Sequence, residues 1–330
     1  MPANLPPEYQ KAEAVYRSAS GLEEKIEALQ EMLRVIPHHK GTDKLIAQHR
    51  KKLSQLRDET QRRAATSRKG TRVHVPKEGA AQVALVGMPN AGKSNLVRDL
   101  TRATPEVAAY PYTTLMPAPG MMPYLNIWIQ LIDTPPVTFE GAKVWLPNIL
   151  KGADALVPVL NLAGDPLEEL DQVLSILKGW KVFFEGMEEA LDAEPGFGKV
   201  LKPVLILANQ VDAEGAAESF EILKERTEGR FPLFAVSAEE GTGLEDWKPE
   251  LFSRLRIIRA YTKSPGKDPD LDDPVILRSG GTVEDFAESI HKDVRKGLKH
   301  AKIWGSSKFD GQKVTRDYVL QDEDIVEVHT

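Results

Sequence analysis

Residues 87–94 have the types and the spacing of a phosphate-binding loop. They read GMPNAGKS and fit the pattern G-x-x-x-x-G-K-[ST], between an apolar run and a helical one. In such a loop, backbone N–H groups converge on phosphate oxygens, and the dipole of the following helix adds to the attraction. Lys93 would reach the β- and γ-phosphates of a nucleotide, and the Ser94 hydroxyl would bind Mg²⁺. An ordinary glycine-rich turn is the alternative, although a chance match in a chain this long is on the order of one in a hundred.

Three further groups of polar residues follow apolar runs later in the chain. Asp133 ends NIWIQLID, where an aspartate can hold the magnesium shell, although alone it would suggest only a turn cap. Asn209 and Asp212 follow KPVLILA, and a carboxylate there could accept both donors of the guanine edge, a pair that adenine lacks. Ser237 and Ala238 end PLFAVSA, so their backbone could approach the base. Groups at successive strand ends predict one crevice.

The elements that must position these groups are a sheet and its covering helices. From residue 80 to about 260, short apolar runs alternate with helical patterns. Strands this apolar are covered on both faces, so we expect the α/β class, with a doubly wound, mostly parallel sheet.

Residues 1–72 are expected to form a basic helical hairpin. Leu22, Ile26, Leu29, Leu33 and Ile36 recur at the spacing of one helix face, and a second helical pattern follows. Between His39 and Arg72, eleven Lys or Arg face three Asp or Glu, in a chain whose net charge is −6. A solvated helical face is one interpretation, and contact with RNA phosphates is the other.

Residues 263–330 predict a small α+β domain. PVILRSGGT, AKIWG and DIVEVHT are typical of short strands, and TVEDFAESIHKDVRKGL predicts one amphipathic helix that Thr282 caps. Basic side chains surround this helix: His291, Lys292, Arg295, Lys296, Lys299 and His300.

The composition excludes several classes of protein. The chain has 330 residues and no cysteine, which excludes disulfides and thiolate metal sites. The longest apolar runs have the length of strands, so we expect a soluble cytoplasmic protein without a membrane span.

The order of these motifs resembles the Obg-type GTPases. GMPNAGKSN and YPYTTLMPAPG (110–120) are close to that family's pattern, and the segments around the core resemble its developmentally regulated GTP-binding protein (DRG) group. The resemblance implies a P-loop GTPase domain over 80–260 and a ubiquitin-like β-grasp TGS domain over 263–330. It makes Thr114 the switch threonine that closes onto Mg²⁺ and the γ-phosphate. The implied nucleotide-binding residues are Gly87, Asn90, Ala91, Gly92, Lys93, Ser94, Asn95, Thr114, Asp133, Asn209, Asp212, Ser237 and Ala238.

The chain departs from the family pattern at three places. Pro136 stands where the family has a glycine whose N–H binds the γ-phosphate, and proline has no N–H. Gln210 replaces a lysine of the guanine motif, which should weaken the packing on the base. The segment after Val137 is too short for the small domain that the DRG group inserts.

The resemblance implies a slow GTPase that binds GTP or GDP with Mg²⁺ and acts on ribosomes or RNA, with an accessory protein as a further candidate partner. Val137 stands where Ras-like proteins place a glutamine that orients the attacking water. Hydrolysis without that glutamine needs another source of charge stabilisation, and in related GTPases an asparagine placed like Asn90 holds a potassium ion. Asn90 could instead only shape the loop. The alternative function is a non-hydrolysing, nucleotide-bound RNA scaffold, in which Pro136 has uncoupled the switch. An ATP-binding relative is a third hypothesis, which Asp212 argues against.

Overall fold

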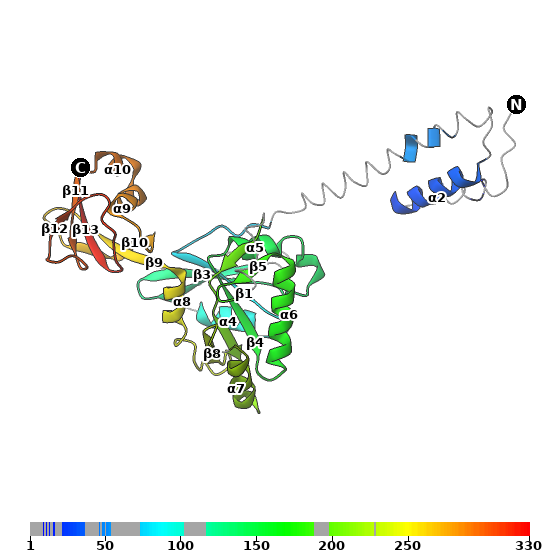
Figure 1. Cartoon of the computed structure of the whole chain (residues 1–330), viewed down its shortest axis with the longest axis horizontal. Coiled ribbons are helices and arrows are strands. Elements are labelled where there is room, and N and C mark those ends of the chain that lie inside the picture. The colour runs from blue at the N-terminus through cyan, green and yellow to red at the C-terminus, as the bar shows by residue number, and fades with distance from the viewer. Residues whose placement is uncertain are drawn as a thin grey trace. The chain divides into compact units, whose positions relative to one another are not determined.

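The computed structural model describes residues 9, 11, 13, 16, 22–36, 46, 48, 49, 51–53, 73–101, 117–187, 198–227 and 229–330 (Figure 1). The chain divides into two compact units, Met1–Arg72 and Val73–Thr330, and each is described by itself.

The described residues of the first unit are helical except Ile36, and five buried residues form one small core. Helix α2 (Leu22–Val35) contributes Leu29 and Met32, which pack with Tyr9 and Ile46. The Tyr9 hydroxyl lies 2.7 Å from His49 Nε2. Lys51 and Lys52 are the members of the basic stretch between His39 and Arg72 that lie within the described residues, and its other basic residues lie outside them.

A six-stranded sheet forms the centre of the second unit, in the order β2-β3-β1-β4-β7-β8. Its strands are β1 (Ala81–Val86), β2 (Ala118–Tyr124), β3 (Ile127–Asp133), β4 (Ala155–Asn161), β7 (Ile206–Asn209) and β8 (Leu233–Val236). Every neighbouring pair is parallel except β2 and β3. The predicted α/β class with a mostly parallel sheet is confirmed.

Helices cover both faces of this sheet. They are α4 (Lys93–Leu100), α5 (Leu146–Gly152), α6 (Pro166–Gly179), α7 (Ala216–Thr227) and α8 (Lys248–Leu255). Successive residues of β1 point to opposite faces: Ala84 and Val86 join the core under α5, α6 and α7, and Val83 and Leu85 join the core under α4 and α8. A 3₁₀ turn (Glu140–Ala142) and a two-stranded sheet, β5 (Val182–Phe184) with β6 (Val200–Lys202), complete this part.

The C-terminal part is a five-stranded sheet, in the order β10-β9-β13-β11-β12, with helices on one face (Figure 1). Its elements are β9 (Ile257–Lys263), β10 (Pro269–Arg278), α9 (Val283–Ile290), α10 (Lys292–Gly297), β11 (His300–Trp304), β12 (Gln312–Val314) and β13 (Asp324–His329). The sheet therefore begins at Ile257, before the boundary at 263 expected from the sequence.

The single amphipathic helix predicted for this part is wrong, because the helix is interrupted at His291. The backbone of His291 is extended, with φ −167° and ψ 144°, and its ring nitrogen accepts from the Asp293 N–H at 3.2 Å. His291 thus ends α9 and caps α10. The predicted cap at Thr282 is present, as a reciprocal capping box with Asp285.

Short connections and polar contacts join the C-terminal sheet to the central one. Arg256 alone separates α8 from β9. The Arg259 guanidinium, in a residue that is 4% exposed, binds both carboxylate oxygens of Asp322 and donates to Asn126 Oδ1 at 3.0 Å, in the turn between β2 and β3. Asp154 accepts from Lys77 Nζ and from Arg278, and so links the chain before β1 to β10.

Candidate nucleotide-binding site

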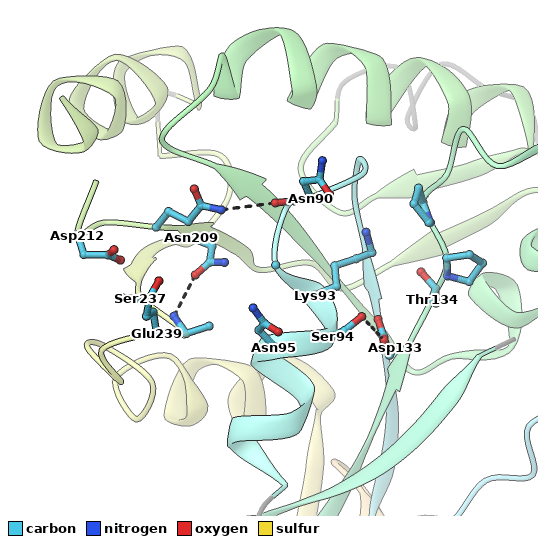
Figure 2. Close-up of a pocket in the computed structure, with 15 residues that line it drawn as sticks. Asn90, Lys93, Ser94, Asn95, Asp133, Thr134, Asn209, Asp212, Ser237 and Glu239 are labelled. Atoms are coloured by element: carbon cyan, nitrogen blue, oxygen red, sulfur yellow. Dashed lines mark hydrogen bonds between the residues drawn. The ribbon is translucent and has the colours of Figure 1, made fainter. Parts of the chain in front are cut away.

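A cavity of about 570 Å³ opens where β1, β3, β7 and β8 end at their carboxyl edges. This size lies within the range of ligand pockets, roughly 300–1,000 Å³. Figure 2 shows the side chains from the four strand ends turned toward the same space. The residues that line it are Asn90, Gly92, Lys93, Ser94, Asn95, Asp133, Thr134, Pro135, Pro136, Asn209, Gln210, Asp212, Ser237, Ala238 and Glu239.

The loop between β1 and α4 curls around the Lys93 side chain. Lys93 Nζ donates to the carbonyl oxygens of Gly87 at 3.2 Å and Met88 at 2.9 Å. Burial lowers the pKa of Lys93 to about 8, against the opposing attraction of Asp133. Gly92 has φ +89°, and a Cβ there would lie 2.0 Å from Asn209 Nδ2, so only glycine fits this position.

Ser94 and Asp133 place two oxygen-bearing side chains next to each other in the cavity. Ser94 Oγ donates to Asp133 Oδ2 at 2.6 Å (Figure 2). Asp133 Oδ1 is buried and has no hydrogen-bond partner within the described parts of the chain. Burial raises the pKa of Asp133, which the Ser94 hydrogen bond and Lys93 oppose. A hydroxyl beside a carboxylate with an unsatisfied oxygen is a donor set suited to Mg²⁺.

Asn209 links the loop after β1 to the segment after β8 by hydrogen bonds. Its Nδ2 donates to Ala91 O at 3.0 Å, and its Oδ1 accepts from Ala238 N at 3.2 Å. The amide is thus engaged by the protein, whereas Asp212, an exposed carboxylate, lines the cavity. Gln210 Nε2 donates to Asn90 O at 3.5 Å, so this residue keeps a link to the phosphate-binding loop.

The segment after Asp133 is fixed to the neighbouring strand. Thr134 Oγ1 donates to Leu85 O at 2.5 Å, and Val137 N donates to Gly87 O at 3.2 Å. Pro135 and Pro136 have no N–H. Residues 135–137 therefore offer no free backbone donor to the cavity.

Most of the site residues predicted from the sequence line the cavity. Gly87 and Ala91 lie behind its wall instead, where their carbonyl groups accept from Lys93 and Asn209. Thr114 falls outside the described residues. Pro136 and Gln210, which the sequence marked as departures from the family pattern, also line the cavity, and sequence reasoning missed three further lining residues: Thr134, Pro135 and Glu239. Their proximity in sequence to predicted members was the available signal.

Known proteins resemble this chain in sequence. The chain is 31% identical to developmentally-regulated G-protein 3 of Arabidopsis thaliana, over 77% of this chain and 83% of that protein. It belongs to the developmentally regulated GTP-binding protein family. The family model described as the TGS domain matches residues 258–330, and the one described as 50S ribosome-binding GTPase matches residues 82–185.

Two further relatives align with this chain over almost their whole length. An uncharacterized GTP-binding protein of Methanocaldococcus jannaschii is 30% identical, over 93% of each chain, and ribosome-interacting GTPase 1 of Saccharomyces cerevisiae is 27% identical, over 92% of this chain and 98% of that one. Each alignment runs over 367 positions, more than the 330 residues here, so the relatives carry internal residues without a counterpart in this chain.

A solved structure supports the fold. The crystal structure of a GTP-binding protein from Pyrococcus horikoshii covers 76% of this chain and 99% of its own, with a TM-score of 0.51 and 19% identity. Within the described residues, no helix has both the length and the apolar character needed to cross a membrane.

Proposed function

We propose that this protein binds GTP and GDP with Mg²⁺ in the cavity described above and hydrolyses GTP slowly. The observation that carries the proposal is the convergence of a phosphate loop, an oxygen pair for a metal, and an exposed carboxylate at one sheet edge. The spacing of these groups suits a nucleotide whose phosphates lie at Lys93 and whose base lies at Asp212.

Each end of the nucleotide has its own contacts in this proposal. When a nucleotide binds, the Lys93 ammonium donates to phosphate oxygens in place of the carbonyl oxygens of Gly87 and Met88. Ser94 and Asp133, joined by Thr114 as the resemblance implies, would hold Mg²⁺, which neutralises charge on the β- and γ-phosphates when bound. Asp212 accepts from guanine and leaves its charge unpaired against adenine.

Slow turnover follows from the residue after Pro136. Val137 is fully buried and apolar, so it cannot orient a water molecule. We propose that a potassium ion held at Asn90 supplies the missing positive charge, since Asn90 is exposed and lines the cavity.

The proposed partner is the ribosome or its RNA, in the cytoplasm. A relative is named a ribosome-interacting GTPase, and the model matching residues 82–185 is described as ribosome-binding. The basic stretch between His39 and Arg72 and the C-terminal domain are the proposed contact regions, and an accessory protein stays a prediction.

Titration with GTP, GDP and ATP in Mg²⁺, followed by turnover at saturating GTP, tests the nucleotide part. We expect tight binding of both guanine nucleotides and slow release of phosphate. Tighter binding of ATP would contradict the guanine assignment. Binding of GTP without turnover, with or without ribosomes and potassium, would instead favour the non-hydrolysing scaffold.

Ribosome co-sedimentation in GDP and in a non-hydrolysable GTP analogue tests the partner. A variant with glutamine at six basic positions (Arg50, Lys51, Lys52, Arg57, Arg62 and Arg63) should bind ribosomes more weakly. Absence of the wild-type protein from the ribosomal pellet in both nucleotides would refute the proposed partner.

A further inference from the structure

The C-terminal sheet has one face without helices, and this face gathers cations and aromatic rings. Along β11, Ala301 and Ile303 enter the core with α9, so His300, Lys302 and Trp304 point to the opposite face. We call this surface the basic sheet face. Its members come from four strands: Lys263, His300, Lys302, Trp304, Lys313, Glu327 and His329.

Positive charge exceeds negative charge on this face. Glu327, which is 4% exposed, accepts from Lys263 at 2.9 Å and from Lys302 at 3.3 Å. The hydrogen bond from Lys263 is the largest cause that lowers the pKa of Glu327 to about 2, so it stays anionic. Lys313 lies opposite Lys302 on β12 and is exposed. One carboxylate thus faces three lysines.

On the helical side of the same domain, where the sequence placed the basic surface, part of the positive charge is paired with nearby acids. Arg295 binds Glu284 at 3.1 Å and Glu288 at 2.7 Å, and Lys296 lies 3.6 Å from Asp293. Three acids thus lie among the cations around the helices, whereas one carboxylate lies among the lysines of the basic sheet face.

Aromatic rings lie among these lysines. The rings of His300 and His329 stack with their centroids 4.6 Å apart and their planes 4° from parallel. Lys263 Nζ lies 4.9 Å from the centre of the Trp304 ring. Desolvation first, and then the charges of Lys313 and other neighbours, lowers the pKa of His300. The side chains of His300, Trp304 and His329 are each half-buried.

We propose that the basic sheet face binds single-stranded RNA, with bases stacking on the rings and phosphates meeting the lysines. Grooves that combine cations with exposed rings are how proteins hold unpaired strands, since every base has a face that can stack. An acidic peptide would match the charge but would leave the flat rings unused. This inference rests on the proposed RNA partner and locates its contact in the C-terminal domain.

The test compares two double variants of the full chain that remove the same charge from opposite faces of one domain. The probe is a labelled single-stranded RNA of about 15 nucleotides, long enough to span a domain of this kind. Lys302→Gln with Lys313→Gln should weaken binding at least fivefold and reduce the slope of log affinity against log salt by about 1.4, at about 0.7 for each lost phosphate contact. Lys292→Gln with Lys296→Gln, on the helical side, should change the affinity less than about twofold.

The stacking role has its own variant. His300→Ala should weaken binding about fivefold or more with little change in the salt slope, and His300→Phe, which keeps a ring, should restore it. A duplex RNA of the same sequence should bind more weakly, because its bases are not free to stack. Circular dichroism melting of each variant shows that the fold is intact.

The outcomes separate this inference from the proposed function. If the wild type binds RNA and ribosomes and both double variants bind as it does, the basic sheet face is wrong while the ribosome partner stands. If the wild type sediments with ribosomes but binds no single-stranded RNA, the inference also falls while the ribosome partner stands, and if it does neither, both fall. Equal weakening by the two double variants, displacement of RNA by polyglutamate at equal charge, or preference for single-stranded DNA would each overturn the assignment to RNA on this face.

Discussion

Replacing Pro136 by glycine should increase the preference of this protein for GTP over GDP by roughly 10-fold to 150-fold. Pro135 and Pro136 have no N–H, and the Val137 N–H already donates to Gly87 O at 3.2 Å. Residues 135–137 of the wild type therefore have no backbone donor that is free to bind the γ-phosphate. The variant restores one donor next to the cavity. A hydrogen bond to a charged group contributes about 1.5–3 kcal/mol, and each 1.4 kcal/mol is about tenfold in affinity.

The surrounding contacts should keep the new donor in place. Thr134 Oγ1 holds the segment to Leu85 O on one side, and Pro136 O accepts from the Phe139 N–H at 2.9 Å on the other. Glycine should lower the free energy of unfolding by up to about 1 kcal/mol through the greater entropy of its unfolded chain. Thermal unfolding of the variant measures this cost separately from nucleotide binding.

Calorimetric titration with GDP and a non-hydrolysable GTP analogue, at fixed Mg²⁺, gives the ratio of the two affinities. Pro136→Ala is the matched control, because it also restores the N–H without the freedom of glycine. Both variants should raise the ratio. An unchanged ratio in both would refute the reasoning, and a rise with glycine alone would assign the effect to flexibility.

Four further changes have expected outcomes. Because burial lowers the pKa of Lys93 to about 8 and bound phosphate favours its charged form, nucleotide affinity should fall by up to about tenfold per pH unit above pH 8, with proton uptake on binding; titrations between pH 7 and 9.5 that show no slope would contradict this. Asp212→Ala should reduce discrimination of GTP against ATP by about tenfold or more, measured as a ratio of dissociation constants. If Asn90 holds potassium, turnover should be faster in potassium than in sodium, and Asn90→Ala should remove the difference; equal wild-type rates would exclude it. Burial would raise the pKa of Asp154, but its hydrogen bonds outweigh burial, so the pKa is lowered. The Asp154 carboxylate therefore stabilises the fold above its ordinary pKa, and this stabilisation is lost as the pH falls through the lowered pKa. Asp154→Asn should make the free energy of unfolding depend less on pH in this acid range.

The sequence was sufficient to predict which residues meet wherever a motif or a strand end gives a side chain a defined place. Lys93, Ser94 and Asp133 belong to this class, and the structure brings them together around one cavity. The role of Asn209 was less visible, because an amide can bind a ligand or the protein. Only the positions of Ala91 and Ala238 show that it binds the protein here.

In the fold, too, local sequence patterns predicted some features, whereas contacts between residues far apart in the chain were not visible in the sequence. Alternating apolar runs predicted the strands of the central sheet, since burial on both faces leaves a mark in composition. The break at His291 was hidden, because the apolar period continues across it while the backbone turns. The partial pairing of the basic residues around the helix was also hidden, because the pairing of Arg295 with Glu284 joins residues eleven positions apart, on separate helices.

The single residue between α8 and β9 has a mechanical consequence. Arg256 adopts φ 50° and ψ 47°, a compact left-handed turn, and consecutive Cα atoms are only about 3.8 Å apart, so the joint has almost no slack. At its other end α8 begins beside Trp247, which is fully buried in the same core as Ala238 of the nucleotide cavity. A movement of the C-terminal sheet would therefore be transmitted through α8 to the wall of the nucleotide site, because Arg256 is the only residue between α8 and β9.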